Sequence, residues 1–402
     1  MRRPQLTLTA LCLVIGVGVA GCSGAPGESD ASAAAAASAT RTLEPAANDL
    51  NLPADYEDRA VMATDWHLPP EEMDGVFVGE RLIGEEQDGT IDVVAVDASG
   101  AILWELEGPP AVLCSGTLIH TTRTAEGQAI VVVTDVEEDA LATPTLTAYD
   151  ITSGEPVWGP VDIPGFRRGP GLVYEDAQHL DQGTAVAKVA LDSATGDVIA
   201  RGSELSDRHI VGEASGTLIT VTNTALEGSV LEDDGPSSTV WSIPLAERRW
   251  NAEDIANRSH PDDLGDEYVA IPSGQGVADI IRIDTGEAVL TGAQQVSYDP
   301  QSGALVAATG NRVFGVHPGE EPWSYEADED VLLMGAGDGL GYAQGAGDLI
   351  ALDLRTGEPK TPRFVAGADR ADAPLIPRSV SSTGAAVVED LETRYFVAAP
   401  SA

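Results

Sequence analysis

Residues 96–104 read Val-Asp-Ala-Ser-Gly-Ala-Ile-Leu-Trp, and the same pattern recurs along the chain. An apolar segment ends in Asp, a short turn with a Gly follows, and a second apolar segment begins. Asp can bond its own backbone two residues on, and Gly supplies the positive φ of a tight turn. The pattern therefore predicts two antiparallel strands joined by a turn. The copies that contain both residues are Asp97 with Gly100, Asp150 with Gly154, Asp192 with Gly196, Asp284 with Gly286, and Asp353 with Gly357.

The spacing of these copies indicates a repeat fold. The Asp residues stand at positions 97, 150, 192, 284 and 353, so the gaps are 53, 42, 92 and 69 residues. The two longest gaps each hold a degenerate copy, one at residues 239–245 and one at 312–323, where His317 stands in the Asp place. Seven copies at a spacing of roughly 40 residues are typical of propeller blades. We expect Trp104, Trp158 and Trp323, on the strand after the turn, to pack against an adjacent blade.

The whole body of the chain favours an all-β fold. From about residue 58, short apolar runs alternate with turn clusters, and no long stretch keeps a helical period. Three further strands are expected near the C-terminus, and residues 60–66 look like an outer strand before the first copy. Together these would complete an eighth blade and remove exposed edges. We predict a β-propeller of eight four-stranded antiparallel blades, with seven blades as the alternative.

The N-terminus predicts a lipoprotein. Its apolar run is too short for a stable membrane span and ends in Val-Ala-Gly before Cys22. This resembles a bacterial lipobox, which implies a signal peptide over residues 1–21 and a Cys22 carrying acyl chains such as palmitate. More than one chain gives stable attachment. We predict a lipidated Cys and flexible Ser/Ala/Gly-rich tether over 22–57, and a propeller over 58–402 at the extracytoplasmic face of the cell membrane.

The repeat resembles that of the pyrroloquinoline-quinone (PQQ)-type β-propellers, in which a strand ending in Ala-Leu-Asp leads through Thr-Gly to Trp. The best match is residues 348–353, Asp-Leu-Ile-Ala-Leu-Asp, followed by Thr356 and Gly357, although no Trp follows them. The resemblance covers residues 58 to 400 and implies a fold more than a function, since the repeat builds scaffolds as well as enzymes. The Ala/Gly/Asp-rich composition suggests a high-GC bacterium. Such an organism need not have an outer membrane, so the role of the propeller lipoprotein of outer-membrane protein assembly is not carried over.

The charge of the chain limits its partners. The sequence has 22 Lys plus Arg against 65 Asp plus Glu, a formal net charge of −43. Such a surface repels nucleic acid and anionic lipid headgroups, so we exclude a nucleic-acid role. Two interpretations remain, solubility in an external or salty environment and steering of a cationic partner or of multivalent cations. The acidic clusters lack the layout of a calcium-binding loop and are interpreted as solvated loops: residues 137–139, 232–234, 262–263 and 326–330.

The sequence contains no recognisable catalytic motif. We find neither a nucleophile elbow nor a phosphate-binding loop, and Cys114 in the body is interpreted as a core residue. The quinone dehydrogenases that the resemblance suggests use a vicinal Cys pair and calcium-binding acids, and the chain has no such pair. We therefore predict no catalytic residues, no cofactor and no metal. The six histidines are scattered without metal-ligand spacing: His67, His120, His179, His209, His260 and His317.

Two functional hypotheses follow. The first is a non-catalytic scaffold that binds an envelope protein or peptide and contacts the membrane only through its lipid anchor. The second is an extracytoplasmic enzyme or small-ligand sensor, binding a quinone or a sugar, with its site at the mouth of the central channel. The degenerate copies around Ile243 and His317 are where we first expect a binding surface.

Overall fold

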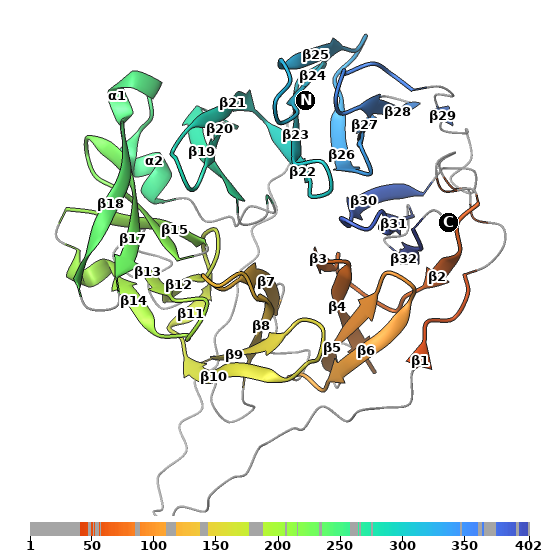
Figure 1. Ribbon diagram of the computed structural model, residues 1–402, viewed down its shortest axis with the longest axis horizontal. Coiled ribbons are helices and arrows are strands. Elements are labelled where there is room, and N and C mark those ends of the chain that lie inside the picture. The colour runs from red at the N-terminus through yellow and green to blue at the C-terminus, as the bar shows by residue number, and fades with distance from the viewer. Residues whose placement is uncertain are drawn as a thin grey trace, which may run out of the picture. The chain divides into compact units, whose positions relative to one another are not determined.

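The β-strands form eight separate antiparallel sheets that follow one another around a ring as the blades of a β-propeller (Figure 1). This computed structural model confirms the predicted all-β fold with eight blades. The structure describes residues 41–46, 50, 52, 56, 58–84, 89–109, 118–136, 144–176, 188–205, 207–214, 216–232, 235–257, 264, 267–274, 276–345, 348–360, 364–365, 375–390 and 394–400.

Within these residues, five blades are four-stranded meanders whose first strand lies nearest the centre of the ring in Figure 1. Ladder hydrogen bonds join consecutive strands, so each sheet is complete before the next begins. The strands are β7 (Ile119–Arg123), β8 (Ala129–Asp135), β9 (Thr145–Asp150) and β10 (Pro156–Asp162) in blade 2; β11 (Gly165–Arg167), β12 (Val173–Asp176), β13 (Lys188–Leu191) and β14 (Val198–Arg201) in blade 3; β15 (His209–Ala214), β16 (Thr217–Val221), β17 (Ala225–Glu232) and β18 (Gly235–Pro244) in blade 4; β22 (Gln295–Asp299), β23 (Ala304–Thr309), β24 (Arg312–Val316) and β25 (Trp323–Glu326) in blade 6; and β26 (Leu332–Gly337), β27 (Leu340–Gln344), β28 (Asp348–Asp353) and β29 (Phe364–Val365) in blade 7.

Blade 8 closes the ring with strands from both ends of the propeller, as predicted. Its outer strand is β2 (Val61–Ala63), in which Met62 pairs with Val397. Arg59, next to β2, donates to Asp338 in blade 7 (2.8 Å) and to the Gly384 carbonyl in blade 8 (2.5 Å). The seven-bladed alternative is therefore wrong. The other strands of the blade are β30 (Ile376–Val380), β31 (Ala386–Glu389) and β32 (Tyr395–Ala398).

Blade 1 has five strands, because a short segment adds to its outer edge. This segment, β1 (Arg41–Thr42), pairs with β6. Pro45 forms a bridge with Met62, and Tyr56 is fully buried. Part of the range 22–57, assigned to the tether, therefore belongs to the propeller, because its apolar side chains pack on blades 1, 7 and 8. The remaining strands are β3 (Glu71–Met73), β4 (Val76–Ile83), β5 (Thr90–Asp97) and β6 (Ala101–Leu106).

Blade 5 has three described strands and is preceded by two short helices that the sequence did not predict. Helix α2 (Ala252–Ala256) contacts β15, β16 and the first strand of blade 5, and its Ile255 is fully buried. The helix thus fills space between blades 4 and 5. Helices of four or five residues are too short to show a hydrophobic period. The elements are α1 (Leu245–Arg248), α2, β19 (Tyr268–Gly274), β20 (Val277–Arg282) and β21 (Ala288–Ala293).

The hydrophobic core lies between neighbouring blades. One cluster joins Val78 and Val93 of blade 1 to Val131 of blade 2, and similar clusters occupy other blade junctions. No blade buries its faces alone, so each depends on its neighbours. Two glycines on β26 allow close approach to β30, and a Cβ on Gly337 would lie 1.9 Å from Val380 Cβ. The alternating glycines of this strand thus have a packing reason.

Candidate functional site

The glycines of the repeat each lie in a turn of blades 1, 2, 3, 5 and 7. In four copies an Asp Oδ1 accepts the backbone N–H two residues on, at distances from 2.6 to 3.1 Å. The glycines adopt positive φ, which a residue with a Cβ rarely does. These contacts lie within single turns and give the blades their shape. The φ values are 83° at Gly100, 68° at Gly154, 74° at Gly196, 70° at Gly286 and 73° at Gly357.

Each tryptophan of the repeat links its blade to the next one. The indole N–H donates to the carbonyl of the residue that follows the turn Asp of the next blade. The ring lies against the turn glycine of that blade, where a Cβ would come within 2.4–2.6 Å of a ring atom. The predicted position of these side chains between blades thus has a specific contact behind it. The bonds run from Trp104 to Ile151 (2.9 Å), from Trp158 to Ser193 (2.9 Å) and from Trp323 to Leu354 (2.7 Å).

Asp284 does not occupy the turn position that the match between repeat copies predicts for it. The N–H of Gly286 donates to the carbonyl of Arg282, so Arg282 stands first in this turn. The carboxylate of Asp284 binds the Arg282 guanidinium (3.1 Å). Trp241 of blade 4 donates to the Ile283 carbonyl (2.7 Å), so the bond between blades is kept. The sequence comparison was wrong here because Asp and Gly stand only two residues apart in this copy.

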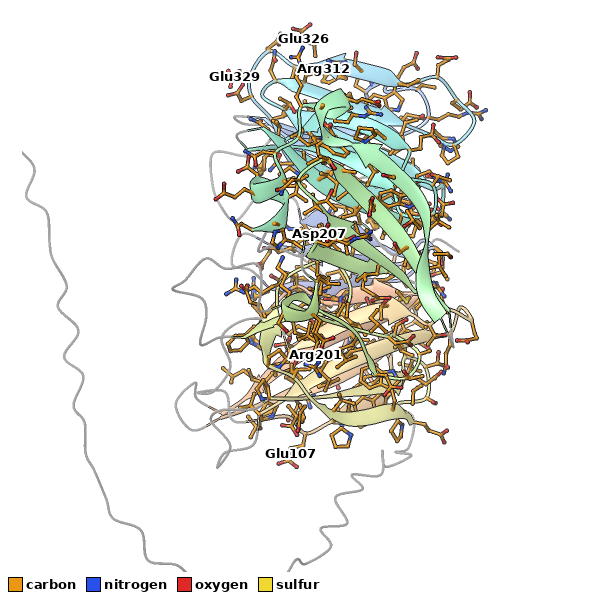
Figure 2. The ribbon with its side chains drawn as sticks, turned by 90° about the vertical axis from the view of Figure 1, so that its left-hand side faces the viewer. Glu107, Arg201, Asp207, Arg312, Glu326 and Glu329 are labelled. Carbon is orange, nitrogen blue, oxygen red and sulfur yellow. The ribbon has the colours of Figure 1, made fainter. Side chains whose placement is uncertain are left out.

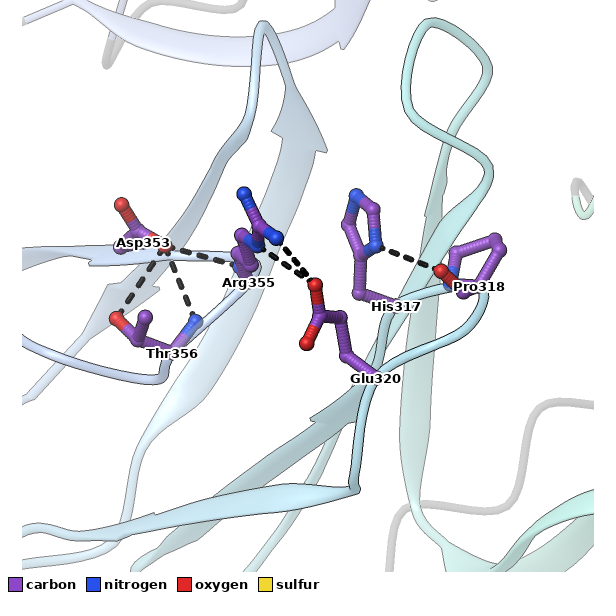
Figure 3. A network of polar contacts seen from close by, with 6 residues as sticks. All are labelled: His317, Pro318, Glu320, Asp353, Arg355 and Thr356. Carbon is purple, nitrogen blue, oxygen red and sulfur yellow. Dashed lines mark hydrogen bonds and ion pairs between the residues drawn. The ribbon is translucent and has the colours of Figure 1, made fainter.

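The degenerate turn at His317 lies beside the repeat turn of blade 7 (Figure 3). His317 Nδ1 lies 3.2 Å from the carbonyl oxygen of its neighbour Pro318. Glu320 binds the guanidinium of Arg355, with 2.9 Å between Arg355 Nε and Glu320 Oε1. An exposed ion pair of this kind is worth at most about 1 kcal/mol. The contacts of His317 are those of a turn residue.

A charged cluster that the sequence did not predict joins the first strands of blades 1, 2 and 3. Oε2 of Glu71, on β3, accepts the N–H (2.5 Å) and hydroxyl (3.0 Å) of Thr121 on β7. His120 Nδ1 lies 3.4 Å from the same oxygen, and Arg167 Nη2 on β11 lies 3.6 Å from Oε1. Arg167 also contacts the His120 ring. These four residues and Glu80 are called the inner polar network below.

The electrostatics of the network differ between its two carboxylates. Burial raises the pKa of Glu71, but the charges of His120 and Arg167 and bonds from His120 and Thr121 outweigh it, so the pKa falls to about 2. Glu71 is therefore ionised at neutral pH. Its charge compensates Arg167 and holds three blades together at their inner ends.

Glu80 on β4 is the most buried acid of the network, with 1% of its surface exposed. Its Oε1 accepts the N–H of Leu118 (2.6 Å), and its Oε2 has no hydrogen-bond partner. Burial raises the pKa of Glu80 to about 7, against the opposing effect of the Leu118 and Ile119 N–H groups. The carboxyl thus changes charge near neutral pH.

Besides Glu80 Oε2, the network offers a ring nitrogen of His120 for ligand recognition. His120 Nε2 is buried and has no hydrogen-bond partner. Little in the sequence predicts this network, since Glu71 and Arg167 lie on three-residue strands without an apolar run. A charged residue on the first strand of three consecutive blades is the signal that was available.

Metal-ligating groups do not converge in the part of the chain that the structure describes. No three His, Cys, Asp or Glu side chains there could hold a metal ion. Cys22, Cys114, His179 and His260 lie outside the described residues. No described helix is long and apolar enough to cross a membrane.

The charge pairing of the surface is uneven. Glu107, Asp207, Glu326 and Glu329 are exposed and appear in Figure 2. Twelve basic side chains among the described residues lie within ion-pair distance of a carboxylate, so much of the positive charge is already neutralised within the chain. They are Arg41, Arg59, Arg81, Arg123, Arg167, Arg168, Arg208, Arg282, Arg355, Lys360, Arg378 and Arg394.

Comparisons with solved structures return a β-propeller domain among the matches. No protein-family model matches the chain, and no curated protein matches it. Dihydro-heme d1 dehydrogenase NirN is 12% identical over 87% of this chain and 81% of its own, with a TM-score of 0.42. The β-propeller domain of the Trilobed protease from Pyrococcus furiosus is 11% identical over 84% of this chain and 94% of its own, with a TM-score of 0.38.

Proposed function

We propose that the chain is a non-catalytic, extracytoplasmic PQQ-like β-propeller, anchored to the cell membrane of a high-GC bacterium through Cys22, that binds a basic envelope protein. A propeller fold suits a scaffold or binding role. Twelve basic side chains already bind carboxylates of the same chain, so they add little repulsion against a basic partner. With a net charge of −43, the surface left to a partner is strongly acidic. Such a surface steers a cationic protein toward the propeller.

A pull-down from solubilised envelopes tests the binding role. Tagged full-length chain should recover a partner with a net positive charge at low salt and lose it as the salt concentration rises. A matched acidic protein without the fold serves as the control for charge alone. Recovery of no partner in repeated preparations would reject the scaffold function.

Replacing the cysteine tests the anchor separately. Cys22→Ser should move the protein from the membrane fraction to the soluble extracytoplasmic fraction, because a Ser at this position cannot take the acyl chains. Retention of the variant in the membrane would reject lipid anchoring, whatever the pull-down shows.

The inner polar network supports a second candidate function, a site for a quinone or a sugar at the channel mouth. The observation in its favour is His120 Nε2, which is buried without a hydrogen-bond partner. PQQ with calcium, or glucose, should then raise the unfolding temperature of the wild type and not that of His120→Ala. Unchanged unfolding temperatures with these ligands would reject this candidate.

A further inference from the structure

The outer strand of blade 4 is unlike the outer strands of other blades. Strand β18 spans ten residues, whereas β14 and β25 span four. Figure 2 faces this side of the ring and shows the long β17–β18 hairpin. The degenerate repeat copy lies here because β17 and β18 continue past the place where other blades turn. The loss of Asp and Gly from this copy thus accompanies a longer strand pair.

The outward edge of β18 is free of a neighbouring strand in the described part of the chain. Among the residues that the structure describes, β18 pairs only with β17. The side chains of residues 238–240 and of Ser242 are exposed. The register with β17 shifts beside Val240, and such a bulge re-aims a side chain. Val240 is 54% exposed, the highest value among the large exposed hydrophobic side chains, and Val230 on β17 is 39% exposed.

Natural proteins usually protect the edges of their sheets with short strands or prolines. Strand β10 follows this rule, with Pro156 at its start and Pro160 within it. In β18, proline stands only near the two ends, at positions 236 and 244. The segment between them keeps its backbone N–H groups and exposes an apolar side chain, which makes it a template for another strand.

Blade 1 shows what such an added strand looks like in this fold. Strand β1 lies against the outer edge of β6, with Arg41 opposite Ile102 and Thr42 opposite Ala101. The guanidinium of Arg41 bonds Glu105 on the same β6 (2.8 Å). An extended segment with a basic residue is therefore accommodated at the outer edge of a blade.

The charge near β18 fits the same kind of segment. From residue 209 to residue 247 the sequence contains several acids and no Lys or Arg. Arg208 neutralises one of them, Glu227 on β17 (3.0 Å), and Arg248 and Arg249 follow this range, so the attraction comes from the net charge of the chain. A second copy of this chain would bring a charge of −43 against −43, which disfavours self-pairing at this edge. A segment with basic and apolar residues would be attracted by the acidic chain and could cover the exposed side chain of Val240.

We propose that residues 238–243 of β18 bind an extended segment of the partner by strand addition, and that this segment alternates basic and apolar residues. The proposal rests on the proposed function and assigns its binding surface. Main-chain hydrogen bonds to β18 hold the segment, an apolar side chain covers Val240, and basic side chains meet the acidic surroundings.

Peptide probes test the mode of binding on the full chain. An octapeptide of alternating Lys and Val should bind in a calorimetric titration at low salt. The same composition with a central Pro, and an octapeptide of alternating Glu and Val, should bind at least tenfold more weakly. Equal binding of the Pro-containing peptide would overturn strand addition.

Two matched variants test the location. Val240→Arg should weaken the Lys-Val peptide at least tenfold, while Val198→Arg, the same change at a 38% exposed position on β14, should alter binding less than twofold. Ser242→Arg serves as a second edge variant, and circular dichroism verifies that all three fold. Equal losses in the β14 and β18 variants would show non-specific charge effects and overturn the location.

Two further outcomes separate this proposal from the proposed function. If the pull-down partner binds wild type and Val240→Arg equally, the scaffold function stands and the β18 surface is rejected. If no partner is recovered by the wild type, the scaffold function itself fails. A wild-type dimer that Val240→Arg converts to a monomer in light scattering would show that a second copy occupies the edge, and would also overturn the proposal.

Discussion

At the scale of single residues, Gly154 joins the geometry of a turn to the packing of two blades. Its φ is 68°, and a Cβ there would lie 2.6 Å from Cγ of Trp104. We expect Gly154→Ala to lower the free energy of unfolding by about 2–4 kcal/mol, because positive φ and overpacking both penalise the methyl group. Urea denaturation followed by tryptophan fluorescence measures the loss.

Gly127 provides the matched control for this substitution. Its φ is 87°, but no atom lies within 4 Å of an added Cβ. Gly127→Ala should therefore lose only about 1 kcal/mol, the cost of the backbone conformation. Equal losses in the two variants would mean that the indole contact contributes nothing.

The raised pKa of Glu80 should make the stability of the folded chain depend on pH. Its pKa is raised from 4.5 to about 7 in the folded chain, so the folded state binds the proton more tightly than the unfolded state. The stabilisation is complete below pH 4.5 and is lost as the pH rises to 7, by about 3 kcal/mol. Glu80→Gln should reduce this slope in urea denaturation between pH 5 and 8, and the part due to Glu72, whose pKa burial also raises to about 7, should remain. Glu155→Gln, at an exposed turn position, should keep the wild-type slope.

At the scale of elements, the sequence predicted the strands and turns that recur in the blades, and it did not predict the elements that occur once. The regular turns, the three tryptophans and the closing strand were all visible, because each leaves a local signal of Asp, Gly or alternating apolar residues. Helix α2 was missed because five residues carry no period. The inner polar network was missed because its residues meet only when three blades stack, and no local pattern connects Glu71 to Arg167.

Strand β2 is the element on which ring closure depends. Met62 is 8% exposed, pairs with Val397 and contacts Gly100 of blade 1. We expect Met62→Pro to destabilise the chain by more than about 3 kcal/mol, because it removes a buried side chain and a ladder donor together. Thr42→Pro, on the exposed two-residue strand β1, should lose less than about 1 kcal/mol. Calorimetric unfolding measures the stability lost in each variant. An equal loss in the β1 and β2 variants would show that ring closure does not depend on β2 in particular.

At the scale of the whole molecule, the charge has a consequence for stability as well as for binding. Sixty-five acids against 22 bases repel one another more strongly in the compact ring than in the unfolded chain. Salt shortens the screening length from about 30 Å at 0.01 M to about 8 Å at 0.15 M. The folded state should gain from salt even as the binding of a basic partner weakens, so the two effects have opposite signs in the same protein.

This contrast gives a prediction that needs no partner. Raising NaCl from 0.01 to 0.15 M should raise the unfolding temperature on the order of 5 °C. CaCl₂ at matched ionic strength should act similarly if the acidic loops are only solvated. A much larger rise at micromolar calcium would instead show a specific ion site and contradict the interpretation of residues 326–330 as a solvated loop. Differential scanning fluorimetry over both salts distinguishes the outcomes, because screening grows smoothly with ionic strength whereas a site saturates.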